Sequence, residues 1–163
     1  MLALIEKYFW VFFISMLPLV ELRGAVPYGV LWGLPLAGVY LTAIVGNMLP
    51  VPIILLFAKK VLLWCTTWPG KLGDLFKKIY EKGVKAGEKL QATAGRGLYF
   101  ALFIFVAIPL PGTGAWTGCL AATLLDMHFG KSVLAVLAGV LTAGVIMGVV
   151  SLGAAGGLAL LLG

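Results

Sequence analysis

Charged residues are scarce in this chain of 163 residues. Only 11% of its positions are Asp, Glu, Lys or Arg, whereas 62% are apolar. Soluble domains contain roughly 25% charged and 45–50% apolar residues, so this composition excludes an ordinary water-soluble domain. The length suits one compact domain better than two. We therefore predict a single, all-α integral membrane domain.

Cysteine and histidine are almost absent. The chain has two cysteines, Cys65 and Cys119, and one histidine, His128. These numbers exclude a disulfide framework and a zinc-type metal cluster. There is also no paired nucleophile and base and no phosphate-cradling loop. We expect no enzymatic activity and no cofactor, and we place His128 in a surface turn.

The basic residues are concentrated in one segment. Between Lys59 and Arg96 nine basic residues face three acidic ones, which accounts for the whole net charge of +6. Basic loops of membrane proteins stay in the cytoplasm, so this segment is expected on the inner side of the cell inner membrane. The charge therefore indicates membrane orientation, and we predict no nucleic-acid partner. The nine residues are Lys59, Lys60, Lys71, Lys77, Lys78, Lys82, Lys85, Lys89 and Arg96.

Part of this basic connection has a helical pattern. Leu72, Leu75, Phe76 and Ile79 recur at the spacing of one helix face. The pattern fits an amphipathic helix lying on the anionic inner leaflet. It also fits a solvated linker helix without a partner, and the sequence leaves both interpretations open.

Four apolar stretches remain, of two kinds. Residues 36–57 and 133–162 are long enough to cross the hydrocarbon layer, which takes about 20 residues. Residues 8–32 and 98–125 instead each consist of two half-length apolar arms joined at a break. The expected order is thus a broken segment, a spanning helix, the basic connection, and then the same pair again.

The second break contains Pro109, Pro111, Gly112 and Gly114. Proline lacks a backbone donor and glycine favours non-helical angles, so peptide groups here lose their partners within the helix. Such a break is tolerated at membrane depth only where protein or a water-filled cavity satisfies those groups. We predict a re-entrant helical hairpin, with a kinked helix that spans fully as the alternative.

The two halves of the chain resemble each other. Pro18-Leu19 precedes Arg23-Gly24-Ala25, as Pro109-Leu110 precedes Thr113-Gly114-Ala115. We predict an inverted repeat with residues 1–63 and 98–163 as its halves and 64–97 as the connection. This topology puts both termini outside and residues 126–131 inside. Four ordinary spanning helices would instead put residue 131 outside.

The first break contains the least expected residues, Glu21 and Arg23. Ionisable side chains within apolar segments are costly and usually functional. Arg23 could hold an anionic group through its planar fork of donors, while Glu21 could carry protons. We predict that the same substrate or proton pathway includes Gly24, Pro27 and the residues of the second break, Pro109, Pro111, Gly112 and Gly114. The structural alternative is a turn at the membrane surface, with both side chains reaching the headgroups.

Asn47 is a second polar point within an apolar segment. It lies in Gly46-Asn47-Met-Leu-Pro50-Val-Pro52. An Asn here could line the transport pathway, or it could join two helices by hydrogen bonds.

Three motifs together resemble a known family. Residues 21–27 (ELRGAVP), 46–52 (GNMLPVP) and 109–118 (PLPGTGAWTG) resemble the small multidrug export protein family, a remote branch of the DedA superfamily. The resemblance implies two facing re-entrant hairpins in an inverted repeat and proton-dependent movement of lipids, including polyprenyl phosphate carriers. Glu21 and Arg23 match the charged first hairpin. The second hairpin has the prolines and glycines but lacks the Arg and acidic residues of typical DedA sequences.

We therefore predict a multi-pass, proton-coupled secondary transporter. Its substrate would be an amphiphilic or lipid-linked anion, or a small molecule in multidrug export. The alternative is a non-transporting structural or lipid-organising membrane protein. The expected partners are membrane lipids and the transported molecule, and Gly139, Gly144 and Gly148 could form a homodimer interface or seat their helix within the chain.

Overall fold

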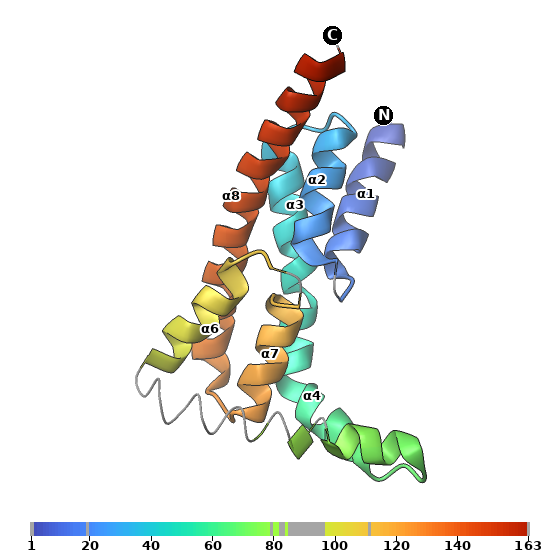
Figure 1. Cartoon of the computed structure of the whole chain (residues 1–163), viewed down its shortest axis with the longest axis vertical. Coiled ribbons are helices and arrows are strands. Elements are labelled where there is room, and N and C mark those ends of the chain that lie inside the picture. The colour runs from blue at the N-terminus through green and yellow to red at the C-terminus, as the bar shows by residue number, and fades with distance from the viewer. Residues whose placement is uncertain are drawn as a thin grey trace.

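The computed structural model describes residues 2–18, 20–78, 80–81, 84, 97–110 and 112–162. These residues form α-helices and no strand, which confirms the predicted all-α fold for this part of the chain (Figure 1). Pro111, Ile79 and the basic residues Lys82, Lys85, Lys89 and Arg96 lie outside it. The helices are α1 (Leu2–Met16), α2 (Glu21–Leu31), α3 (Leu36–Met48), α4 (Pro50–Thr66), α6 (Leu98–Ala107), α7 (Ala115–Leu124) and α8 (Phe129–Leu162).

Two long apolar helices run along the molecule. α3 and α4 follow each other without a change of direction, because Leu49 between them keeps helical angles (φ −61°, ψ −44°) despite the proline that follows. The spans Leu36–Thr66 and Phe129–Ala154 are each long and apolar enough to cross a membrane. The prediction of two spanning helices agrees with this. The first extends nine residues beyond its predicted end at Phe57, so Lys59 and Lys60 lie on α4 rather than in the connection.

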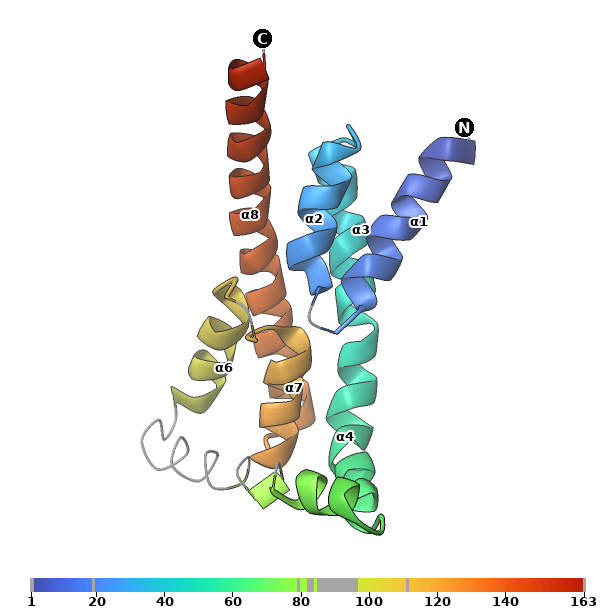
Figure 2. The same ribbon diagram turned by 45° about the vertical axis from the view of Figure 1, so that its right-hand side comes forward.

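The other four helices form two hairpins. α1 and α2 lie beside α3 in the upper half of Figure 1, and α6 and α7 lie beside α8 and α4 in the lower half. The two turns meet near the middle of the molecule in both side views (Figure 2). At about 1.5 Å per residue, α2, α6 and α7 are each only about 15 Å long. This is half of the roughly 30 Å hydrocarbon thickness.

The first break differs slightly from its predicted position. α1 ends at Met16 and α2 begins at Glu21, so Glu21 and Arg23 belong to the first turn of α2 and not to the break itself. Glu21 adopts a left-handed backbone angle (φ +52°), which is uncommon for a residue with a side chain. That angle changes the chain direction at the first residue of α2.

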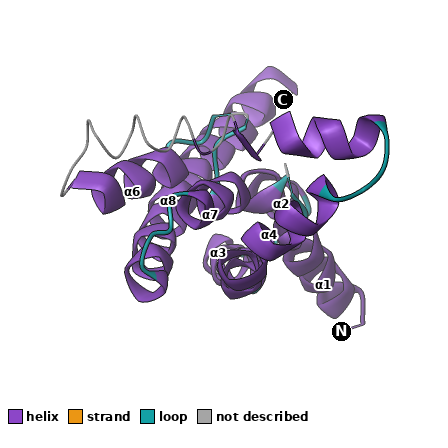
Figure 3. Cartoon of the chain, turned by 90° about the horizontal axis from the view of Figure 1, so that it is seen from below, coloured by secondary structure: helices purple, strands orange, loops and turns teal. Residues whose placement is uncertain are grey.

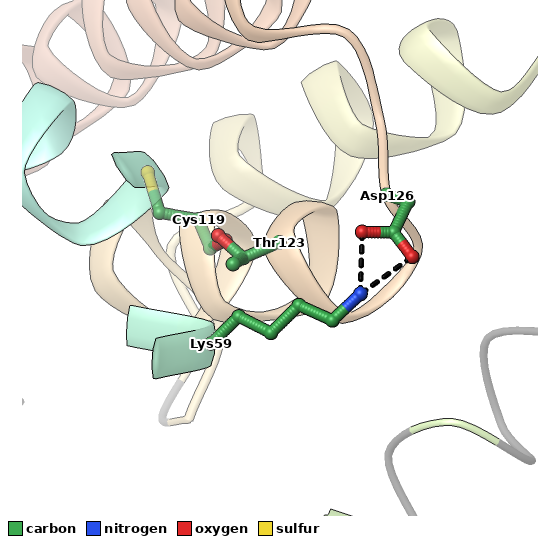
Figure 4. Close-up of polar contacts among 4 residues, drawn as sticks. All are labelled: Lys59, Cys119, Thr123 and Asp126. Carbon is green, nitrogen blue, oxygen red and sulfur yellow. Dashed lines mark hydrogen bonds and ion pairs between the residues drawn. The ribbon is translucent and has the colours of Figure 1, made fainter. Parts of the chain in front are cut away.

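The basic connection and the turn between α7 and α8 lie at the same end of the molecule. The Nζ atom of Lys59 on α4 is 2.6 Å from both carboxylate oxygens of Asp126, in the α7–α8 turn (Figure 4). The N-terminus and the end of α8 lie at the opposite end (Figure 1). Seen from below, α3, α7 and α8 lie between α1 and α6 (Figure 3).

Small residues allow α8 to pack closely against both hairpins. A Cβ atom at Gly139 would come within 2.6 Å of the Val106 side chain on α6, and one at Gly144 would overlap the Tyr40 ring on α3. Val136 and Val140, also on α8, are fully buried. Of the two roles predicted for these glycines, the structure therefore supports seating within the chain at positions 139 and 144.

Candidate functional site

The candidate site is the junction where the two hairpin turns meet, formed by Met16, Glu21, Arg23 and residues 108–116. Glu21 is only 4% exposed. Its Oε2 accepts a hydrogen bond from the backbone N–H of Ala115 (3.2 Å), and its Oε1 accepts one from Trp116 (3.0 Å). These are the first two N–H groups of α7, which have no partner within their own helix. Glu21 therefore caps a helix that lies 94 residues further along the chain.

Gly114 allows this contact. It is the residue before α7, where a side-chain cap would normally sit, and its angles (φ +138°, ψ −173°) suit glycine alone. A Cβ atom at this position would overlap the Glu21 carboxylate. Because Gly114 has no side chain, the Glu21 carboxylate can occupy this space.

Arg23 binds the other open end of the second hairpin. Its Nη2 donates to the carbonyl of Ile108 (3.1 Å), and its Nη1 donates to the carbonyls of Leu110 and Thr113. Ile108 follows the last residue of α6, so these carbonyls lie at the C-terminal end of that helix and in the turn after it. Among the described residues, three of the five N–H donors of the guanidinium are used, which leaves two.

The second hairpin in turn caps the first. The indole Nε1 of Trp116 donates to the carbonyl of Met16, the last residue of α1, at 3.1 Å. Terminal helix carbonyls need such donors where water is excluded. Each hairpin therefore satisfies backbone groups that the break in the other hairpin leaves open.

Glu21 and Arg23 form no ion pair with each other in the described part of the chain, although they are two residues apart. Residues at this spacing do not face each other on a helix. The carboxylate bonds to N–H groups at the positive end of α7, and the guanidinium bonds to carbonyls at the negative end of α6. Each charge is thus placed at the helix end that favours it.

An apolar groove of about 420 Å³ begins at this junction. Met16 and Trp116 line one end, and the groove continues along α4 past Phe57 to Val61, with Leu120 of α7 opposite. The dimensions and apolar walls suit a hydrocarbon chain. Amphiphilic molecules have such a chain next to a polar group, and the polar junction lies at the groove's upper end.

The remaining predicted residues are only partly brought together. Gly112 and Pro109 are in the turn of the second hairpin, where Gly112 has φ +82° and open space around it. Gly24 is in the first turn of α2 and lies against the Val20 side chain. Pro27 lies further along the same helix. Pro111 was predicted as part of this site and lies outside the described residues.

Asn47 is buried, at 2% exposure, on α3. Its Oδ1 has no hydrogen-bond partner among the residues that the structure describes. The neighbouring Gly46 lies against Ser15 and the Phe12 carbonyl of α1, so Asn47 is near the end of the first hairpin. The predicted hydrogen bond between helices is therefore not formed through this oxygen.

The sequence interpretation missed Met16, Thr113 and Trp116 as site residues. The Trp116 signal was available, because a buried indole N–H requires an acceptor and this Trp follows directly after a break in a helix. Nothing in the sequence indicates which carbonyl it reaches. In the described ranges, no group of three His, Cys, Asp or Glu residues comes together that could hold a metal ion.

Comparison with known proteins identifies the family. No curated protein and no solved structure matches the chain. One family model matches residues 21–146, under the description "Putative small multi-drug export protein". The match begins at Glu21 and includes α2, α3, α4, α6, α7 and half of α8. Since it covers well over half of the sequence, the chain belongs to this family of small multi-drug export proteins.

Proposed function

We propose that the protein is a multi-pass secondary transporter of the cell inner membrane, with its transport site at the junction of the two hairpins. The observation that carries the proposal is the Glu21 carboxylate, buried and bonded to the first two N–H groups of α7. An acid in this position joins the two hairpins, and a proton can release the contact. The export family and the two apolar helices of spanning length support membrane transport.

The hairpins are re-entrant in this proposal and form the tips of an inverted repeat. Their four helices, of 10 to 15 residues, are all shorter than the roughly 20 residues that a spanning helix needs, and their turns lie at mid-height. The Lys59–Asp126 contact supports the same topology, because four spanning helices would place Asp126 at the opposite end from Lys59. The hydrogen bond between Arg23 and Thr113 joins two positions that correspond in the two halves of the sequence.

The chemistry of the Glu21 contact supports proton coupling in this proposal. An ionised carboxylate accepts at both oxygens, whereas a protonated one carries a donor on one of them and accepts less well. Hydrogen bonds to a charged group contribute about 1.5–3 kcal/mol each, so protonation weakens the connection between α2 and α7. The hairpins can then separate and expose Arg23 with its two remaining donors.

The substrate is an amphiphilic anion in this proposal. Arg23 offers charge and a planar donor fork for a carboxylate or phosphate group. The apolar groove that begins at Met16 and Trp116 offers a place for the hydrocarbon part. A lipid-linked anion and an exported amphiphilic small molecule share this chemistry, and we assign the protein no catalytic step.

A second candidate function is a structural or lipid-organising role without transport. The five hydrogen bonds of Glu21 and Arg23 to the second hairpin satisfy backbone groups that the helix breaks leave open. These contacts alone would explain why charges occur at this depth. Both candidates therefore rely on the same contacts and differ in whether the contacts open.

Flux measurements in liposomes separate the two candidates. We would impose a pH gradient on the purified protein and follow a polyprenyl phosphate and, separately, a cationic dye. Glu21→Gln should abolish the dependence of flux on the gradient, and Arg23→Lys should lower flux of the anion by keeping charge but losing the fork. Glu6→Gln, at an exposed position of α1, is the matched control.

The size of the groove provides a further test of the substrate. Leu120→Trp should fill the groove and lower movement of the long-chain phosphate more than that of the compact dye. A wild-type protein without any flux, whose Glu21→Gln variant only loses thermal stability, would support the structural role. Folded variants with wild-type flux would place the transport site elsewhere.

A further inference from the structure

The segment after α4 turns sharply and lies across the end of the molecule. Gly70 has a left-handed angle (φ +87°) that reverses the chain, and residues 71–78 are helical. This helix, which we call the basal helix, runs across the lower end of the bundle in both side views, while α4 and α8 run along it (Figures 1 and 2). An element across the axis of spanning helices lies parallel to the membrane plane.

Aromatic contacts hold the basal helix against α4. The rings of Trp64 and Trp68 are 5.1 Å apart, and those of Trp68 and Phe76 are 6.2 Å apart, both edge to face. Gly73 brings the helix close to the Trp68 carbonyl, which a Cβ atom would overlap. The orientation of the helix is therefore set by packing within the chain and not by the loop alone.

One side of the basal helix and its surroundings are apolar and uncovered. Leu72 is 58% exposed, Leu75 is 52% exposed and Trp64 is 61% exposed. The two leucines are three positions apart, so they share a helix face. Exposed tryptophans beside them are typical of the boundary between headgroups and acyl chains.

The charges are arranged around this apolar face. Lys71 and Lys78 lie along one edge of it, and Asp74 and Lys77 lie further round, towards the opposite side, by helical spacing. Long lysine side chains at such flanks can follow apolar surface and place their charge among headgroups. Three lysines against one acid favour anionic over neutral lipids.

We propose that the basal helix is a binding surface for the anionic leaflet of the membrane, with Leu72 and Leu75 inserted below the headgroups and Lys71 and Lys78 on their phosphates. Its occupant is a lipid surface, because the exposed apolar face lies in the plane in which a bilayer boundary would run. The surface is separate from the hairpin junction and does not depend on the transport function.

Spin labels test the proposal in the full-length protein. Single cysteines at positions 72, 75 and 74 would be introduced into a Cys65→Ala, Cys119→Ala background and labelled in vesicles of phosphatidylcholine, with and without phosphatidylglycerol. In anionic vesicles, the ratio of oxygen to nickel-complex accessibility should be several-fold higher at 72 and 75 than at 74, the matched position on the polar side. The contrast should shrink in neutral vesicles and in the Lys71→Gln, Lys77→Gln, Lys78→Gln variant.

Equal accessibility at the three positions in anionic vesicles would overturn the proposal in favour of a solvated linker. A contrast of the same size in neutral vesicles would overturn the preference for anionic lipid. The thermal stability of each labelled variant shows whether the fold is retained, and a second label pair at positions 75 and 77, on opposite sides of the basal helix, repeats the comparison if a position 72 variant does not fold.

Discussion

The two hairpins meet at one junction but contribute opposite parts to it. The first carries both charges, Glu21 and Arg23, in the first turn of α2. The second carries no charge at its turn and instead presents open backbone groups, made available by Gly112, Gly114 and the neighbouring prolines. A charged side chain and an open helix end are complementary. The uncharged break in the second hairpin can therefore bind the charged side chains of the first.

This difference also explains how the second hairpin can lack Arg and acidic residues at its turn. The backbone of the second hairpin binds the charges of the first directly, through the α7 N–H groups and the carbonyls of the turn that follows α6. Side-chain symmetry is therefore not needed for the two turns to be joined.

The largest expected effect on stability comes from adding a side chain at Gly114, in the turn of the uncharged second hairpin. Gly114→Ala should lower the free energy of unfolding by about 2–4 kcal/mol, because the residue must leave a conformation that costs non-glycine residues about 1–3 kcal/mol and the Glu21 carboxylate must also move. Thermal or denaturant unfolding in detergent measures the change. Gly112→Ala is the control, with its positive φ but no neighbour, and should cost about 1–2 kcal/mol.

A double-mutant cycle identifies the origin of the Gly114 effect. In a Glu21→Ala background the added methyl group no longer meets a carboxylate, so Gly114→Ala should be less harmful than in the wild type. Additive effects would show that the backbone angle alone determines the loss, and that the two hairpins are less tightly coupled than their contacts indicate.

An intermediate effect on stability is expected from the hydrogen bond that the second hairpin donates to the first, between Trp116 and Met16. Trp116→Phe retains an aromatic ring and removes the N–H that reaches the Met16 carbonyl, so unfolding should become easier by about 0.5–1.5 kcal/mol. Trp64→Phe on exposed α4 surface is the control and should have little effect. Equal losses in the two variants would assign the change to ring size.

The smallest effect is expected at the outer end of the second hairpin. Lys59→Gln removes the ion pair with Asp126, in which both side chains are partly exposed, and should cost only about 0.2–1 kcal/mol. High salt should reduce the difference from the wild type. Lys60→Gln, which loses no ion pair among the described residues, is the matched control, and a loss above that of Gly114→Ala would reverse the importance that we give to the junction.

Much of the fold could be predicted from the sequence. The apolar runs in 36–57 and 133–162, the breaks near Glu21 and at 109–114, and the helical pattern of Leu72, Leu75 and Phe76 all correspond to helices or turns in the structure. Predicted ends were less accurate. Lys59 and Lys60 suggested that the first long helix had ended, whereas their long side chains extend from a helix that continues to Thr66.

The sequence by itself determined that the chain is helical, apolar and interrupted at two places, because helix period, length and proline or glycine breaks are local properties. Only the tertiary structure decided what the breaks bind. Glu21 accepts hydrogen bonds from the N–H groups of Ala115 and Trp116, and Arg23 donates to three backbone carbonyls. The Trp116 indole donates to the Met16 carbonyl. Local rules state that open backbone groups need partners within a membrane, but they do not select a partner some ninety residues away; packing of both hairpins against α8 brings the partners together.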